Sequence, residues 1–401
     1  MSDPGLLDDD LSLAPEVPAD ENELILLSDP DMTVIELQAV TEALQAPRLS
    51  AGPRVEAFEA AFAAYVGRKY AVAVQSGTMG LLMCLKAYGI GAGDEVIASP
   101  YSFRETVHAV SLSGARPVFA DIDYWAGTLQ PEKAAARITD RTRAVIAGNT
   151  NGHPAPWTAF RDLATAHGLI LLEDSTEAIG SRYKGRVVGA FGDCAVFDFS
   201  QPSALICGEG GMVVTDDIDI AVALRRYRAH RPDERGSVVV SMTAPFQAGM
   251  SDLAAALGTA QLGRIEEILE RRHCVESLYL RYVQSFEGIK DPFIGPDVDE
   301  VNWFLYVVHL GTRFSKSSRD AIVEDLRVEK VESAAYSNPL HLQRHYMDLG
   351  YRRGDYLVTE KVSDRAISLP FHAHLSEDEI EFIVATMKDA SVNVGAGSAI
   401  Y

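Results

Sequence analysis

The 401-residue chain lacks several features that would place it in a specialised class of protein. It has no run of 18 or more apolar residues, so no segment is expected to cross a membrane as a helix. Its acidic N-terminus has neither the basic region nor the apolar stretch of a secretory signal, which makes the cytoplasm the expected location. Its four cysteines show no CxxC spacing, so neither a disulfide framework nor a metal site is expected.

Basic residues are also scarce. The formal net charge is −21, and residues 1–31 contain ten Asp or Glu and no Lys or Arg. Nucleic acids and anionic membranes attract cationic surfaces, so neither is expected as a partner. The composition predicts that residues 1–32 form an acidic tail, disordered or loosely docked, for which a solubilising role is the simplest interpretation.

The rest of the chain alternates between helical periodicity and short apolar runs. The segment "VEAFEAAFAAYVG" predicts an amphipathic helix that ends at Gly67, and "YAVAV" predicts the buried strand that follows. This alternation predicts an α/β fold in which a mostly parallel sheet lies between helices. Residues 250–286 then predict one long helix. The change of rhythm indicates a large α/β domain at 33–264 and a smaller α+β domain at 265–401.

Polar residues follow two of the predicted strands. Ser76, Gly77 and Thr78 stand between a strand and a helix, where free backbone amides can bind an anion such as phosphate, although such turns are also common structural punctuation. Glu173 and Asp174 end the apolar run "LILLED". Ligands of α/β sheets bind at the carboxyl ends of strands, so a ligand site is predicted at this edge.

An ordered series of segments resembles the DegT/DnrJ/StrS sugar-aminotransferase family. The segments include "GPRVEAFEAAFAAYVG", "SGTMGLLMCLKA", "GARPVFADID", "LEDSTEAIGSRYKGRVVG" and "GEGGMVVTDD", and the resemblance spans about residues 33–390. It implies the fold-type I architecture of enzymes that depend on pyridoxal phosphate (PLP). It also implies a homodimer with composite active sites and a small-molecule substrate, such as a keto sugar or keto-cyclitol of an antibiotic or surface-polysaccharide pathway.

The resemblance implies a cofactor site that is only partly kept. The motif at residues 76–78 matches the phosphate-binding motif, Phe103 matches the aromatic that stacks on the pyridine ring, and Asp174 matches the carboxylate that keeps the pyridine nitrogen protonated. The Schiff-base lysine of the family falls on Ser203. A serine cannot form the imine, so ordinary transamination is not expected.

The phosphate-binding serine of the family falls on Asp198. A carboxylate about 4 Å from a phosphate charge would weaken binding roughly a thousandfold at an effective dielectric constant near 20. We therefore expect no covalently bound cofactor, and we expect non-covalent binding of PLP or of its amine form, pyridoxamine phosphate (PMP), to be disfavoured.

Without that cofactor the predicted pocket is rich in acids. Clustered carboxylates push each other's proton affinities apart, which suits acid/base catalysis or the binding of a cationic amine or a sugar-like ligand. The alternative is that these acids are relics of a decayed site. The candidate catalytic residues are Glu177, Asp174, Asp198, Ser203, Asn149 and His153.

Two classes of function follow from these residues. The first is an enzyme with altered, lysine-independent chemistry on a sugar-, cyclitol- or amine-bearing metabolite in bacterial secondary metabolism, with a PMP-dependent dehydratase-like enzyme as a variant. The second is a catalytically inactive protein that pairs with or regulates an active aminotransferase. Five replacements of the family's residues are polar, which favours the enzyme; they are Ser203, Asp198, Asn149, Glu177 and Gln247.

Overall fold

The computed structural model describes residues 24–47, 49–229, 244–283, 289–290 and 292–397. Its centre is a seven-stranded sheet with the order β1-β9-β8-β5-β4-β2-β3. Strand β9 runs antiparallel to both of its neighbours, and the other pairs are parallel. The strands are β1 (Tyr70–Val74), β2 (Glu95–Ala98), β3 (Arg116–Phe119), β4 (Thr142–Gly148), β5 (Ile170–Asp174), β8 (Cys194–Asp198) and β9 (Gly211–Thr215). The predicted mostly parallel sheet is confirmed.

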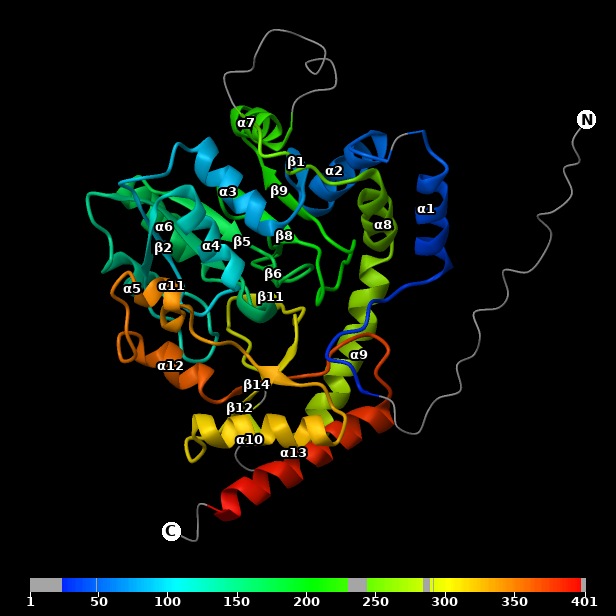
Figure 1. Cartoon of the computed structure of the whole chain (residues 1–401), viewed down its shortest axis with the longest axis vertical. Helices are drawn as coiled ribbons and strands as arrows, with labels where there is room; N and C mark the ends of the chain where they lie inside the picture. The colour runs from blue at the N-terminus through cyan, green and yellow to red at the C-terminus, as the bar shows by residue number, and fades with distance from the viewer. Residues whose placement is uncertain (1–23, 48, 230–243, 284–288, 291, 398–401) are drawn as a thin grey trace, which may run out of the picture.

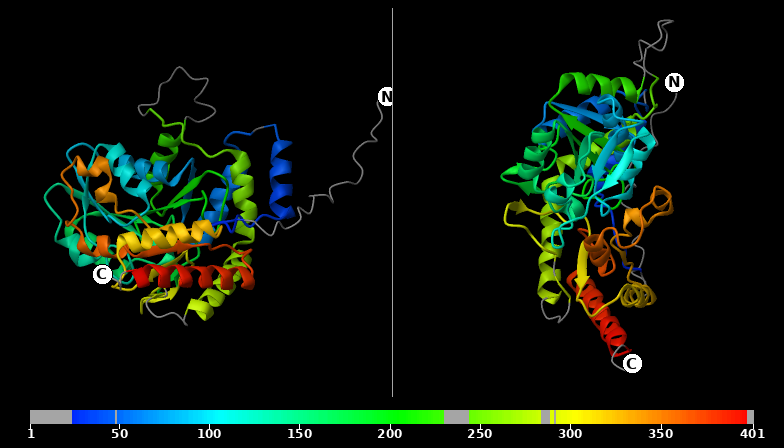
Figure 2. Two further views of the ribbon diagram at one scale, coloured as in Figure 1. Left: turned by 60° about the horizontal axis from the view of Figure 1, so that its bottom comes forward. Right: turned by 90° about the vertical axis from the view of Figure 1, so that its left-hand side faces the viewer.

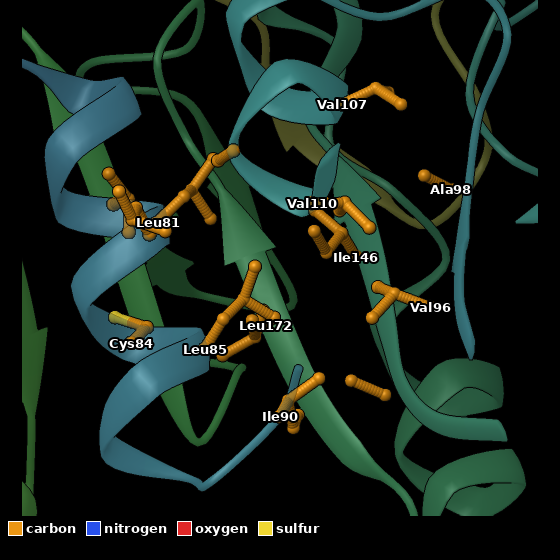
Figure 3. Close-up of a cluster of buried hydrophobic side chains, with 14 of the residues drawn as sticks. Leu81, Cys84, Leu85, Ile90, Val96, Ala98, Val107, Val110, Ile146 and Leu172 are labelled. Carbon is orange, nitrogen blue, oxygen red and sulfur yellow. The ribbon is translucent and has the colours of Figure 1, made fainter. Parts of the chain in front are cut away.

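Helices cover both faces of this sheet (Figure 1). Leu172 of β5 packs with Leu81 and Leu85 on one face, as Figure 3 shows. The preceding residue, Leu171, packs with Phe160 on the other face. Successive strand residues point to opposite faces, so a continuous apolar run is what two covered faces require. The helices of the first face are α3 (Gly77–Ala87), α4 (Arg104–Ser113) and α7 (Ile218–Arg228); those of the second are α2 (Pro53–Val66), α6 (Trp157–His167) and α8 (Asp252–Gly263).

A second, antiparallel sheet with the order β10-β12-β14-β13 follows in the C-terminal part of the chain. Helices α10 and α13 pack against each other beside it (Figure 2). Its strands are β10 (Ile289–Lys290), β12 (Tyr306–Leu310), β13 (Ala334–Ala335) and β14 (Ala366–Leu369), and its helices are α10 (Lys316–Val328) and α13 (Glu377–Gly397). The remaining elements are α1 (Val34–Leu44), α5 (Pro131–Ala135), η1 (Thr150–Gly152), β6 (Arg182–Tyr183), β7 (Arg186–Val187), α9 (Ile265–Val283), β11 (Val298–Glu300), η3 (Leu340–Leu342), α11 (Arg344–Met347) and α12 (Leu357–Ser363).

The long helix predicted for residues 250–286 is two helices, and residues 284–286 lie outside the described part. Helix α8 ends at Gly263 and α9 begins at Ile265. Arg264 stands between them, and its guanidinium group forms ion pairs with Asp31 at 2.9 Å and Glu36 at 2.8 Å. The backbone at Arg264 departs from helical geometry, and its side chain binds these two acids of the N-terminal region.

Helix α9 joins the two parts of the protein. Its first turns, at Ile265 and Leu269, pack in the core beside the seven-stranded sheet, and its later turns, at Val275 and Tyr279, pack in the core of the second sheet. The domain boundary at residue 265 therefore stays a prediction, since one helix contributes to both cores.

Residues 24–31, which we call the N-terminal strap, pair with the segment that leads into β13. Residues 1–23 of the predicted acidic tail lie outside the described residues. Ile25 forms a β-bridge with Val331, and the side chain of Gln201 donates to the carbonyl oxygen of Ser28 at 3.3 Å. Asp31 is only 5% exposed. The strap is thus tied to the fold at Ile25, Ser28 and Asp31, while Leu24 and Leu26 are 48% and 41% exposed, and the loose docking predicted for residues 1–32 stays a prediction.

The cysteines and the hydrophobic helices agree with an ordinary globular interior. Cys84, Cys194 and Cys207 are buried as free thiols, and Cys274 is exposed. Among the described residues, no helix combines the length and the apolar character needed to span a bilayer.

Candidate active site

The end of β5 carries two buried acids that point to opposite faces of the sheet. The carboxylate of Glu173 accepts backbone N–H bonds from Phe191 at 2.8 Å and Gly192 at 3.0 Å, and a further one from Gly189. Glu173 therefore anchors the loop before β8. Asp174, the next residue, faces the other way, toward α4.

Asp174 is 4% exposed and lies under the start of α4. The hydroxyl of Thr106 donates to one of its oxygens, and the backbone N–H of Thr176 donates to the other at 3.1 Å. Burial raises the pKa of Asp174, although these hydrogen bonds act in the opposite direction. The carboxyl group is thus fixed in position and can share a proton with a basic atom of a ligand.

A small hollow lies above the ends of β4 and β5 and encloses about 180 Å³ when the space open to solvent is included. It brings together four of the residues predicted from the sequence, which are Phe103, Asn149, Asp174 and Glu177. Ser102, Gly148 and Thr150 complete its lining. The structure thus brings these four residues together at the carboxyl ends of β4 and β5, and their role in a site stays a prediction.

Glu177 is the most strongly perturbed acid of the hollow. Its Oε2 atom accepts hydrogen bonds from the Tyr336 hydroxyl at 2.6 Å and from the Asn151 backbone N–H at 2.7 Å. Burial outweighs these bonds and raises the pKa of Glu177 to about 7. A carboxyl with this pKa exchanges its proton near neutral pH, which is what a general acid or base requires.

A second pocket, which encloses about 370 Å³ when the space open to solvent is included, is lined in part by Tyr336 and has an aromatic wall. The Tyr101 hydroxyl donates to the backbone carbonyl of Tyr336 at 2.8 Å, which fixes the backbone at this tyrosine. Thr150 lines both of them. The aromatic residues of this pocket are Tyr101, Trp125, Phe293, Trp303 and Tyr336. Sequence reasoning missed Tyr336, which is 159 positions from Glu177.

The predicted phosphate motif lies at the N-terminus of α3. Ser76 caps the helix, and its Oγ accepts the N–H of Met79 at 3.3 Å. The N–H of Gly77 donates to Oδ2 of Asp198 at 2.6 Å. Thr78 is half-buried in the first turn. The Asp198 carboxylate therefore already accepts the hydrogen bond from the Gly77 amide, which was predicted to bind a phosphate.

Asn149 lines the hollow, but its side chain holds the backbone together. Its Oδ1 accepts from the N–H of Ala155 and the indole N–H of Trp157, both at 2.9 Å. Its amide donates to Glu173 at 3.2 Å and to Ser175 at 2.9 Å. With both ends engaged, Asn149 is a positioning residue for the loops around the hollow.

His153 and Ser203 do not line the small hollow. The Nδ1 atom of His153 is 2.9 Å from the carbonyl oxygen of Pro154, and its Nε2 accepts the Gly295 N–H at 3.1 Å. Burial lowers the pKa of His153, so the neutral ring is favoured. Ser203 is buried, and its Oγ accepts a long hydrogen bond of 3.4 Å from the N–H of Leu205.

Comparison with known proteins assigns the chain to a family. The profile of the DegT/DnrJ/EryC1/StrS aminotransferase family matches residues 30–388. The spore coat polysaccharide biosynthesis protein SpsC of Bacillus subtilis is 36% identical over 365 residues, which is 88% of this chain and 94% of SpsC. The GDP-perosamine synthase of Caulobacter vibrioides is 33% identical over 344 residues, which is 86% of this chain and 91% of the synthase.

Solved structures agree with this assignment. DesV of S. venezuelae, in complex with a ketimine intermediate, has a TM-score of 0.84 at 30% identity and covers 92% of this chain and 98% of DesV. The sugar aminotransferase Spr1654 of Streptococcus pneumoniae has a TM-score of 0.88 in its PMP form and 0.86 in its PLP form, both at 24% identity. The PMP form covers 94% of this chain and 100% of Spr1654.

These findings overturn the prediction that a pyridoxal cofactor is disfavoured. The family is one of aminotransferases, and DesV, which is 30% identical, was solved in complex with a ketimine intermediate. The prediction gave too much weight to Asp198. The other end of the site fits the cofactor ring, because the buried acid Asp174 and the aromatic Phe103 line one hollow. With this fold, this matched range and these relatives, the chain belongs to the DegT/DnrJ/EryC1/StrS aminotransferase family.

Proposed function

We propose that the protein is an enzyme that binds a pyridoxal-type cofactor and uses Glu177, in place of a lysine, to move a proton on a sugar-like substrate. The observation that carries this proposal is the buried Glu177 carboxyl, with a pKa of about 7, in the same hollow as Asp174 and Phe103. The family and the names of its relatives, a polysaccharide biosynthesis protein and a GDP-perosamine synthase, support the substrate class.

The ring end of the cofactor would lie against Asp174 and Phe103. When bound, such a cofactor supplies an electron sink for reactions at a carbon that carries an amino group. Asp174 would hold a proton at the ring nitrogen, since its buried carboxyl is fixed by Thr106 and Thr176. The aromatic face of Phe103 would keep the ring in place and exclude water.

Glu177 is the group best placed to take up and return a proton. The resemblance to the family places its lysine at Ser203, whose hydroxyl is a weak base and accepts only a long bond from Leu205. Tyr336 donates to the ionised form of Glu177, and its own pKa is raised well above the usual value, so the phenol keeps its proton. The pair therefore provides a base near pH 7 beside a fixed hydrogen-bond donor.

The aromatic pocket supplies a place for the substrate. Trp125 and Phe293 lie with ring centroids 6.3 Å apart, and Trp303 lines the same pocket. Flat apolar surfaces of this kind suit the face of a pyranose ring or another planar group. A homodimer, a role in antibiotic biosynthesis and a cytoplasmic location stay predictions.

The proposal is tested by binding and turnover together. Titration with PLP and with PMP is expected to give saturable changes in absorbance and protein fluorescence. With the cofactor, an amino donor and a panel of nucleotide-linked keto and amino sugars, mass spectrometry is expected to detect product. Glu177→Gln is expected to lower turnover by about 10²–10⁴-fold without loss of cofactor binding. Unchanged turnover in this variant would contradict the role of Glu177, and no product from any substrate would favour a non-catalytic partner protein.

Tyr336→Phe is expected to move the pH–rate profile to higher pH. The hydrogen bond from Tyr336 lowers the pKa of Glu177, so its loss raises that pKa further above about 7. Activity at pH 7 falls several-fold, on the order of 3- to 10-fold, and recovers at higher pH as the carboxyl ionises. The matched control is Tyr101→Phe, which removes the neighbouring hydroxyl that bonds to the backbone of Tyr336. A profile that stays in place for Tyr336→Phe would show that Glu177 is not the titrating group.

A further inference from the structure

We propose that the aromatic pocket is a binding site for an alkylated ammonium group, so that the ligand of this pocket carries a positive charge with an apolar surface. This inference deepens the proposed function and rests on it in one respect, because it takes the pocket as part of the substrate site beside Glu177. It names the chemical group of the substrate that the pocket receives.

Five aromatic rings line the pocket from separate parts of the chain. Trp125 and Phe293 are 50% and 39% exposed, and their ring centroids lie 6.3 Å apart at an interplanar angle of 44°. The rings of Tyr101 and Tyr336 are buried and meet edge to face at 5.6 Å, and Trp303 completes the set. The face of an aromatic ring attracts a cation that lies within about 6 Å of its centroid, and tryptophan does so most strongly.

The lining carries no permanent charge of its own. Among the described residues that line the pocket there is no Lys, Arg, Asp or Glu, and the side chains other than the rings are small, apolar or uncharged polar ones, together with His309. Burial raises the pKa of the Tyr101 hydroxyl far above its usual range, so this phenol keeps its proton. Arg319, whose charge acts on Tyr101, is paired with Asp320 at 2.7 Å. A phosphate or carboxylate would therefore find no counter-ion among these lining residues.

Acids lie directly behind the lining. The carboxylate of Asp123 accepts the backbone N–H groups of Trp125 and Ala126, both at 2.8 Å, so it lies beside the loop that carries the exposed tryptophan. The Tyr336 hydroxyl donates to the carboxyl of Glu177 at 2.6 Å. The whole chain has a formal net charge of −21. The electrostatic potential at the pocket therefore favours a cation over a neutral group of the same shape.

The position of these acids decides which cation fits. A primary ammonium group has three N–H donors, and it would lose their hydration without a carboxylate in the lining to replace it. A tertiary or quaternary ammonium group presents alkyl groups to the rings and keeps its charge. Thr150 lines both this pocket and the hollow of Glu177, so such a group would lie next to the proposed reaction site. The expected substrate is a sugar-like molecule that carries an alkylated amino group.

The test compares choline with 3,3-dimethylbutan-1-ol, which has the same shape but a neutral carbon in place of the charged nitrogen. Dissociation constants are measured on the full chain by ligand-observed NMR titration at physiological salt. Choline is expected to bind the wild type roughly ten- to thirtyfold more tightly than the alcohol. Trp125→Leu keeps an apolar side chain and every charge of the protein but removes the ring. It is expected to weaken choline binding about tenfold and to change binding of the alcohol by less than about threefold.

Two further variants complete the test. Phe293→Leu guards against a folding defect at Trp125 and is expected to weaken choline binding by about threefold. Phe246→Leu is the matched control, because Phe246 is also 39% exposed but packs beside Tyr227, at 5.9 Å, and does not line the pocket. It is expected to leave both dissociation constants within about twofold of the wild type.

The inference is overturned if choline and the alcohol bind the wild type equally, or if neither binds. It is also overturned if Trp125→Leu weakens both by the same factor, since this would show an apolar pocket that does not recognise charge. In a turnover assay choline is expected to compete with the substrate, and a lack of competition would contradict the placement of the substrate in this pocket. Selective choline binding by a protein that forms no product would instead overturn the proposed function and leave the ligand class of the pocket in place.

Discussion

Glu177→Gln is expected to stabilise the protein relative to the wild type, by about 1 kcal/mol at pH 5 and about 3 kcal/mol at pH 8. The pKa of Glu177 is about 7 in the folded protein against an ordinary value of 4.5. Between these values the unfolded chain has lost a proton that the folded chain keeps, so wild-type stability falls as pH rises through this window and levels off above pH 7. Glutamine is neutral throughout and keeps an oxygen for the donors Tyr336 and Asn151.

The measurement is urea-induced unfolding of both proteins from pH 5 to pH 8. The matched control is Glu173→Gln, four residues earlier and also buried. Glu173 uses both oxygens to accept backbone N–H bonds from the loop at 189–192, so an amide NH₂ group there faces other donors. This control is expected to destabilise the protein by about 1–3 kcal/mol. A difference between Glu177→Gln and the wild type that does not vary with pH would refute the raised pKa.

Arg264→Met is expected to destabilise the protein by about 3–5 kcal/mol, because it leaves the buried Glu36 without a cation and Asp31 with Arg271 as its remaining one. Asp31 and Glu36 are 5% and 2% exposed, and both pair with the guanidinium group. Burial alone would raise the pKa of Glu36, but hydrogen bonds from Thr33 and Arg264 lower it to about 2. The Glu36–Arg264 ion pair therefore stabilises the fold above pH 4.5, and this stabilisation is lost as the pH falls toward 2.

Chemical unfolding at pH 7 measures this effect. Arg281→Met is the comparison, since Arg281 forms a similar ion pair with Glu377 at 2.8 Å but is 65% exposed, and little change is expected. The double variant Arg264→Met with Glu36→Gln is expected to recover part of the loss, because one uncompensated charge is gone. Equal stability of Arg264→Met and Arg281→Met would show that the buried cluster contributes nothing.

The architecture could be predicted from the sequence because its signals are local. The run "LILLED" is apolar on both faces and becomes β5 between α3 and α6. The break between α8 and α9 could not be predicted in this way. Nothing near Arg264 in the sequence shows that its partners are Asp31 and Glu36, more than 200 residues away.

The candidate site shows the same limit. Strand ends predicted that Asp174 and Glu177 lie together, because ligands gather at the carboxyl edge of a parallel sheet, and both line one hollow in the structure. The base-like character of Glu177 depends on burial and on Tyr336, which follows β13 in the second sheet, so it became visible only in the folded chain. Asn149 was predicted to be catalytic from its residue type and its position. Its side chain instead accepts hydrogen bonds from Ala155 and Trp157 and so holds the surrounding loop in place.

The N-terminal strap has a practical consequence for anyone who purifies this protein. Ser28 accepts a bond from Gln201, in the loop between Asp198 and Ser203, and Leu27 donates to Glu332, four residues before Tyr336. The strap thus touches the two segments that carry the unusual residues of the site. Removal of residues 24–31 during the preparation of a shortened protein would therefore take away contacts with both of these segments.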